Sequence, residues 1–293
     1  MGLDINGVKL LLHAKQLEVN FNKVVTIGRQ MLYLKETEMK RLLIQAGFND
    51  ARDMKTFKLH NYAESFLKML GAETTDSLDA SAYENASLIH DLNLPLPKEL
   101  FSLYSVVIDG GSLEHVFNFP TAIKNCMNLI EKEGHYIGIT PANNFLGHGF
   151  YQFSPELYYR IFSPANGFKM IKMYLYADRK GASFYEVLDP MDLKQRVTMA
   201  NSYPSYLFIL AQKTEEKEVF KVVPQQSDYE HIAWSKATSG IASDQVKQAN
   251  TKLAKLKGKW IDLYHRQLRP MGNSNPQSVR KIDLDLSIPG SRK

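Results

Sequence analysis

Carboxylates end three strand-like segments of the chain, and their positions point to a ligand-binding edge of a sheet. The apolar residues 106–108 are followed by Asp109 and Gly110, the segment 86–93 is apolar and then acidic at Asp91, and the strand-like segment 73–79 ends in Asp79. An apolar run that stops at an acidic residue is typical of a buried parallel strand, whose carboxyl end is where open α/β folds bind ligands. Carboxylates there accept hydrogen bonds from hydroxyl groups and favour a cationic ligand. We therefore expect these three acids to face one ligand.

Two histidines are candidate proton acceptors beside this edge. His115 follows the Asp109 strand, and His148 lies between two glycines in the loop after the apolar run 135–141. A neutral imidazole can take a proton near neutral pH, so either residue could serve a reaction at a hydroxyl group. We expect His148 to act as the base and His115 to fix its turn. Tyr151 could orient a hydroxylated substrate through its phenol.

Strand-like and helical segments alternate in the part of the chain that carries these residues. The strand-like segments 24–28, 73–79, 86–93, 106–109 and 135–141 are separated by segments such as 32–46 and 62–70 with helical spacing. This alternation predicts a doubly wound, mostly parallel sheet covered on both faces. The later runs 168–177 and 206–213 predict an antiparallel edge. The stretch 178–205 between them is too long for a tight turn, and we expect it near the site.

The order and wording of these segments resemble a known family. Ser-Leu-Glu-His-Val (residues 112–116), a helix, and Gly-His-Tyr-Ile-Gly-Ile-Thr-Pro (residues 134–141) closely resemble the fourth and fifth motifs of class I S-adenosylmethionine-dependent methyltransferases. The resemblance covers residues 24–213. It implies a Rossmann-like α/β fold, S-adenosyl-L-methionine as cofactor and methyl transfer by in-line displacement.

The resemblance also implies roles for individual residues. Asp79 aligns with the acid that binds the ribose, Asp91 beside Leu92 with the acid that meets the adenine, and Asp109 with Gly110 lies near the methionine part. The loop around His148 resembles the acceptor loop of a subgroup from polysaccharide and natural-product biosynthesis. A sugar or small-molecule hydroxyl, with a histidine base, is the acceptor that this implies.

The first motif departs from the family. The usual glycine-rich turn lets the backbone approach the cofactor, whereas this chain has Gly28 followed by Arg29 and Gln30. Either the loop takes another course, with Gln30 or backbone amides holding the cofactor's carboxylate, or cofactor binding is weak or lost. A nicotinamide dehydrogenase is disfavoured more strongly, because its pyrophosphate requires the G-x-G-x-x-G turn.

Charge divides the chain into two expected domains. The net charge is +5, and residues 225–293 hold 12 Lys and Arg against 6 Asp and Glu. We expect a methyltransferase-like α/β domain over residues 1–224 and a basic helical extension over residues 225–293. Apolar residues recur at helical spacing from Val246 to Leu263, which predicts a helix that packs on its own subunit or forms a homodimer.

Other classes of protein find little support. The single cysteine, Cys126, allows no intramolecular disulfide, and the scattered histidines give no metal signature, so no metal is expected. No membrane span or signal peptide is evident, so the cytoplasm is the expected location. Two alternatives to a small-molecule methyltransferase stay open: an inactive binding or assembly subunit, and an RNA methyltransferase guided by its basic tail.

Overall fold

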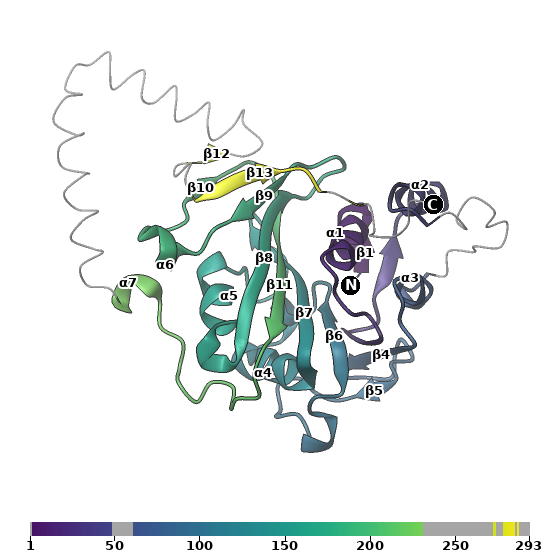
Figure 1. Ribbon diagram of the computed structural model, residues 1–293, viewed down its shortest axis with the longest axis horizontal. Helices are drawn as coiled ribbons and strands as arrows, with labels where there is room; N and C mark the ends of the chain where they lie inside the picture. Colours follow the sequence, from purple (N-terminus) through teal and green to yellow (C-terminus); the bar gives the residue numbers. More distant parts are fainter. Residues whose placement is uncertain (1, 49–60, 231–271, 274–277, 285, 287–293) are drawn as a thin grey trace, which may run out of the picture.

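The computed structural model describes residues 2–48, 61–230, 272–273, 278–284 and 286. A nine-stranded sheet crosses the middle of the molecule (Figure 1), and its strand order is β13-β9-β8-β11-β7-β6-β2-β4-β5. Within the described residues, no helix is both long and apolar enough to cross a lipid bilayer.

One half of the sheet is parallel and the other is antiparallel, as expected. The parallel strands, from the edge inwards, are β5 (Leu88–Ile89), β4 (Thr74–Asp79), β2 (Lys23–Ile27), β6 (Tyr104–Asp109) and β7 (Ile130–Asn143). The antiparallel strands are β11 (Ser205–Lys213), β8 (Phe168–Ala177), β9 (Phe184–Val187) and β13 (Val279–Ile282). The predicted doubly wound sheet with an antiparallel edge is therefore confirmed.

Helices cover both faces of the sheet. One hydrophobic core lies under α1 (Ile5–Gln16), α2 (Glu36–Gln45) and α3 (Glu64–Met69), and the other lies under α4 (Phe119–Leu129) and α5 (Pro155–Ile161). Strand β6 is buried along its whole length: Val106 and Ile108 contribute to the first core and Val107 to the second. Alternation of side chains along a strand explains why an uninterrupted apolar run serves two cores. Cys126 is buried on α4.

Two segments differ from the sequence-based expectations. The predicted helix over 32–46 begins only at Glu36, because β3 (Met31–Tyr33) pairs in parallel with β1 (Gly2–Asp4). The stretch 178–205 contains β9, the short helix α6 (Pro190–Leu193) and β10 (Met199–Ala200), which pairs with β12 (Gly272–Asn273). Strand β9 pairs with β8 and so extends the main sheet, which means that this stretch is not only a loop.

The expected C-terminal extension is described only in part. The helix predicted over residues 246–263, and with it the proposed homodimer and nucleic-acid contacts, lies outside the described residues. The described pieces of residues 225–293 include α7 (Ser227–Glu230) and strand β13, which pairs with β9 at the edge of the main sheet. The short helices η2 (Lys98–Leu100), η3 (Leu113–His115) and η4 (Pro164–Asn166) complete the elements that we name.

Candidate functional site

The sheet has its change of direction between β2 and β6. These neighbouring parallel strands send the chain to opposite faces, towards α2 after β2 and towards α4 after β6. Loops that diverge in this way leave a crevice at the carboxyl ends of the two strands. The loop of Gly28, Arg29 and Gln30 and the loop from Gly110 to His115 meet there.

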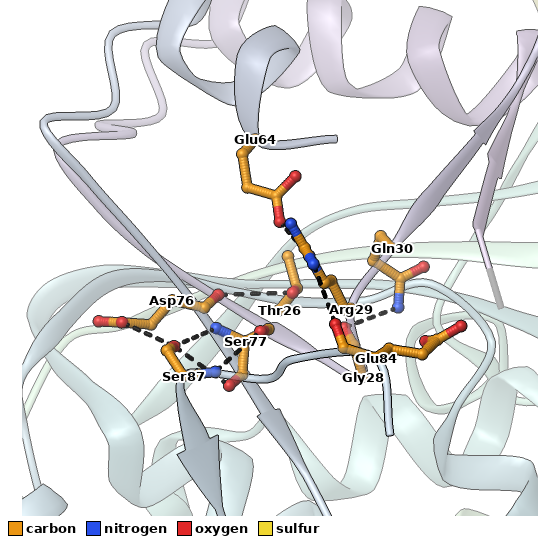
Figure 2. Close-up of polar contacts among 9 residues, drawn as sticks. All are labelled: Thr26, Gly28, Arg29, Gln30, Glu64, Asp76, Ser77, Glu84 and Ser87. Atoms are coloured by element: carbon orange, nitrogen blue, oxygen red, sulfur yellow. Dashed lines mark hydrogen bonds and ion pairs between the residues drawn. The ribbon is translucent and has the colours of Figure 1, made fainter. Parts of the chain in front are cut away.

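The Arg29 side chain points towards Glu64 and Glu84 (Figure 2). Its Nε donates to Glu64 Oε1 at 2.6 Å, and Nη1 donates to the carbonyl oxygen of Glu84 at 2.9 Å. Its guanidinium carbon lies 3.9 Å from the centre of the Tyr62 ring. A large side chain therefore replaces a small one in the first motif without filling the site, because α3 and the segment before β5 bind it.

Gln30 turns inwards instead and is only 1% exposed. Its Nε2 donates to the carbonyl oxygen of Ile27 at 2.7 Å and to that of Gly28 at 3.4 Å, so this amide nitrogen is already used inside its own loop. Figure 2 draws the contact with Gly28. Its Oε1 has no hydrogen-bond partner among the described residues. A Cβ atom at Gly110 would lie 2.2 Å from this oxygen, so the glycine is what makes room for the Gln30 side chain. The loop thus presents a buried acceptor where a carboxylate-binding donor was expected.

A first cavity, which we call the Asp79 pocket, has a volume of about 330 Å³. It lies at the ends of β2, β4 and β6 and brings together several of the predicted residues. Those that line it include Gly28, Asp79, Asp91, Leu92, Ser112 and His115. Of the three acids expected to face one ligand, Asp79 and Asp91 line this pocket and Asp109 does not. Binding of a ligand by these residues stays a prediction.

The two acids of this pocket are partly satisfied by their own turns. Asp79 Oδ1 accepts from the Ser81 N–H at 3.1 Å, and Asp91 Oδ1 accepts from the Asn93 N–H at 2.9 Å. This Asn93 hydrogen bond lowers the pKa of Asp91. One oxygen of each carboxylate has no partner among the described residues and remains available to a ligand. Hydrogen bonds among Asp76, Ser77 and Ser87 fasten β4 to the segment that leads into β5 (Figure 2).

Asp109 is placed differently from the other two acids. It is fully buried, Oδ1 accepts from the Ser112 N–H at 2.8 Å, and Oδ2 accepts from the Tyr136 hydroxyl at 3.3 Å. Burial raises the pKa of its carboxyl group. Asp109 lines neither pocket described here, so its visible role is to hold the turn that leads to His115.

A second cavity, the Glu114 pocket, lies on the other side of His115 and has a volume of about 260 Å³. Among the described residues that line it, acidic and aromatic side chains predominate and neither lysine nor arginine occurs. They include Asp4, Tyr33, Glu114, His148, Tyr176 and Asp178. Gly110 and His115 also line it, and His115 is the residue that the two pockets share.

Glu114 has an unusual environment in this pocket. It is 1% exposed, and neither carboxylate oxygen has a hydrogen-bond partner among the described residues. Burial, and then the charge of Asp109, raise the pKa of its carboxyl group. The Nε2 of His148 lies 3.5 Å from Glu114 Oε1, and the rings of His115 and His148 have their centres 4.9 Å apart. Burial and the nearby His148 lower the pKa of His115.

Backbone contacts seat the His148 loop on Glu114. The N–H groups of Phe150 and Tyr151 donate to the Glu114 carbonyl oxygen at 2.7 and 3.3 Å. Gly149 has a φ of 66°, and a Cβ there would lie 2.8 Å from the same oxygen. The second of the two glycines around His148 is thus required by a close approach and by a left-handed backbone.

The predicted catalytic residues are only partly brought together. His115 and His148 face the same pocket, but the Tyr151 hydroxyl donates to the Phe117 carbonyl oxygen at 2.6 Å, and Tyr151 lines neither pocket. Sequence reasoning gave Glu114, Asp4 and Asp178 no role. Glu114 sits inside the Leu-Glu-His segment that carried the resemblance, whereas no local pattern marks Asp4 or Asp178.

Comparisons with known proteins find likeness in the fold only. No protein-family model matches the chain, and no curated protein does. A provisionally assigned methyltransferase from Bacillus halodurans is 8% identical with a TM-score of 0.39, over 69% of this chain and 99% of that one. The YcgJ protein from Bacillus subtilis is 8% identical with a TM-score of 0.38, over 72% and 100%. The trans-methyltransferase CalH, solved with SAH, is 12% identical with a TM-score of 0.37, over 71% and 57%. Likeness at these identities and scores assigns neither activity nor ligand to this chain.

Proposed function

We propose that the chain is an S-adenosyl-L-methionine-dependent methyltransferase that acts on a hydroxyl group of a sugar or another small molecule. The observation that carries the proposal is the position of His115 between the two pockets. A ligand in the Asp79 pocket and a ligand in the Glu114 pocket would meet at this residue. Alignment of two bound reactants is the main contribution that an enzyme makes to a displacement reaction.

The Asp79 pocket fits the adenosine part of the cofactor. Asp79 and Asp91 each keep a carboxylate oxygen that can accept from ribose hydroxyls or an amino group. Leu92 supplies an apolar wall of this pocket, whereas Gln30 does not line it. When bound, S-adenosyl-L-methionine supplies an electrophilic methyl group whose carbon–sulfur bond breaks, with the electron pair returning to sulfur.

The Glu114 pocket is the proposed acceptor site. An acceptor hydroxyl held beside His115 and His148 can form its bond to the methyl carbon while His148 takes the hydroxyl proton. We assign the base to His148 and not to His115, because His148 lines only the Glu114 pocket whereas His115 lines both pockets. The aromatic residues Tyr33 and Tyr176 offer ring faces and hydroxyls of the kind that hold sugars or aromatic alcohols.

The proposal is tested by titration calorimetry with S-adenosylhomocysteine on the full chain. We expect one site per chain. Release of S-adenosylhomocysteine is then measured over a panel of sugar and phenolic acceptors. His148→Ala should lower the rate about 100-fold, the usual contribution of a positioned base, with little change in cofactor affinity. Absence of any heat at millimolar ligand would contradict the enzyme function and favour a binding or assembly subunit.

A further inference from the structure

One cluster in the Glu114 pocket consists of side chains that can bind a metal ion: Glu114, His115 and His148. Each can offer a ligand atom to one point, and these atoms all lie within 4.8 Å of one another. Both oxygens of the buried Glu114 carboxylate lack hydrogen-bond partners among the described residues. A buried carboxylate without a hydrogen-bond donor costs roughly several kcal/mol in the ionised form, and a bound cation would offset that cost.

One pair in the cluster is already near the spacing of two ligands on one ion, and the three ligand atoms lie within 4.8 Å of one another. The 3.5 Å between His148 Nε2 and Glu114 Oε1 is longer than a normal N–H···O bond. Two ligands that each lie about 2.1 Å from a tetrahedral ion are about 3.4 Å apart. Small rotations of the exposed His115 and His148 rings would complete the arrangement around the fixed carboxylate.

We propose that Glu114, His115 and His148 bind a divalent cation of the zinc type. Two imidazoles and one carboxylate leave at least one coordination position open, which is the arrangement of catalytic zinc sites. The open position faces the Glu114 pocket, whose described lining residues include Asp4 and Asp178 and neither lysine nor arginine. Backbone contacts from Phe150 and Tyr151 keep the His148 loop against Glu114.

The role of the cation rests on the proposed function, whereas its binding does not. An acceptor hydroxyl that binds the open position would lose its proton to solvent more easily, because a bound cation lowers the pKa of an oxygen ligand. His148 is then a ligand, and the cation takes over the task that the imidazole has in the cation-free protein. The cation site includes His115, which also lines the pocket proposed for the methyl donor.

The test is direct binding to the untagged full chain after treatment with a chelator. We expect one Co²⁺ per chain, detected by its visible absorption, and displacement of Co²⁺ by Zn²⁺. Glu114→Gln and His148→Ala should each weaken binding about 100-fold or more, because changes that merely surround a metal ligand already cost 10–100-fold. His90→Ala is the matched control, since it removes a histidine whose ring contacts the Leu94 carbonyl oxygen outside the cluster.

Three results would overturn the proposal: no Co²⁺ on the folded chain, unchanged affinity in both cluster variants, or an equal loss in His90→Ala. Circular dichroism verifies folding, and the isosteric Glu114→Gln decides the matter if His148→Ala does not fold. Calorimetry with S-adenosylhomocysteine on the same preparation separates the two proposals. If the protein binds S-adenosylhomocysteine but does not bind Co²⁺, only the cation site is overturned. If it binds Co²⁺ but does not bind S-adenosylhomocysteine, only the proposed function is overturned.

Discussion

The Asp79 pocket and the Glu114 pocket lie on two sides of His115, yet their polar groups are organised in opposite ways. Asp79 and Asp91 lie at strand ends, and each is already engaged by its own turn. Glu114 is buried, and its carboxylate oxygens have no hydrogen-bond partner among the described residues. His148 approaches it from a separate loop. A site built from strand ends is stable while empty, whereas a site built around a buried unpaired carboxylate stores free energy that a ligand can release.

The largest expected effect concerns ligand binding in the Asp79 pocket. Asp79→Ala should weaken binding of S-adenosylhomocysteine by roughly 1.5 to 3 kcal/mol, the scale for loss of a charged hydrogen-bond partner. Calorimetry measures this, with Asp178→Ala in the other pocket as the control that keeps its affinity. An unchanged dissociation constant for a folded Asp79→Ala protein would mean that this acid only caps its turn.

The seating of the His148 loop gives the next effect. Gly149→Ala should lower the free energy of unfolding by roughly 2 kcal/mol, because a non-glycine residue is forced into the left-handed region against the Glu114 carbonyl oxygen. Gly147→Ala, where an added Cβ meets nothing within 4 Å, should stay within about 0.5 kcal/mol of the parent. Urea denaturation compares the two, and equal effects would contradict the close approach at Gly149.

Removal of the buried acid of the Glu114 pocket should increase the stability of the protein. Glu114→Leu should raise the free energy of unfolding of the chelator-treated protein by about 1 kcal/mol, because it removes an unsatisfied buried carboxylate. Glu114→Gln leaves a buried polar group in place and should give less. Thermal and urea unfolding check this, and a clear loss of stability in Glu114→Leu would reveal a partner for the carboxylate.

The smallest effect concerns the substituted first motif. Arg29→Lys keeps the charge but cannot reproduce the two hydrogen bonds to Glu64 and Glu84 together with the stacking on Tyr62. The pair with Glu64 is partly exposed, so we expect a loss of only about 0.5 kcal/mol in stability. Arg41→Lys on α2 is a surface control. A larger loss, accompanied by weaker S-adenosylhomocysteine binding, would make Arg29 part of the Asp79 pocket's support.

Much of the fold could be predicted because its strands are locally marked. Strand β6 is buried on both faces, so its apolar run was visible in the sequence. Asp79 at the end of β4 and Asp91 shortly after β5 marked the edge of the sheet at which these strands end. The pairing of β1 with β3 was not visible, because each strand has only three residues and its partner lies far away along the chain. Strand β9 was likewise hidden inside a charged stretch.

The site was predicted less completely than the fold, for a physical reason. Residues at strand ends are brought together by the sheet itself, so Gly28, Asp79 and Asp91 could be grouped from their order. The Glu114 cluster depends on a loop that folds back through the left-handed Gly149. The inward turn of Gln30 depends on the missing side chain of Gly110. Contacts of this kind leave no periodic signal in a sequence.

The position of β13 has a consequence for how the chain reaches its native state. Val279–Ile282 pairs with β9 although a long stretch of sequence separates them (Figure 1). Contacts between distant segments form late in folding, because the chain entropy lost on closing the loop must be offset first. Until β13 docks, the outer backbone groups of β9 are unpaired, and an open strand edge can recruit another chain. A truncation before β13 would therefore be expected to favour association between folding intermediates.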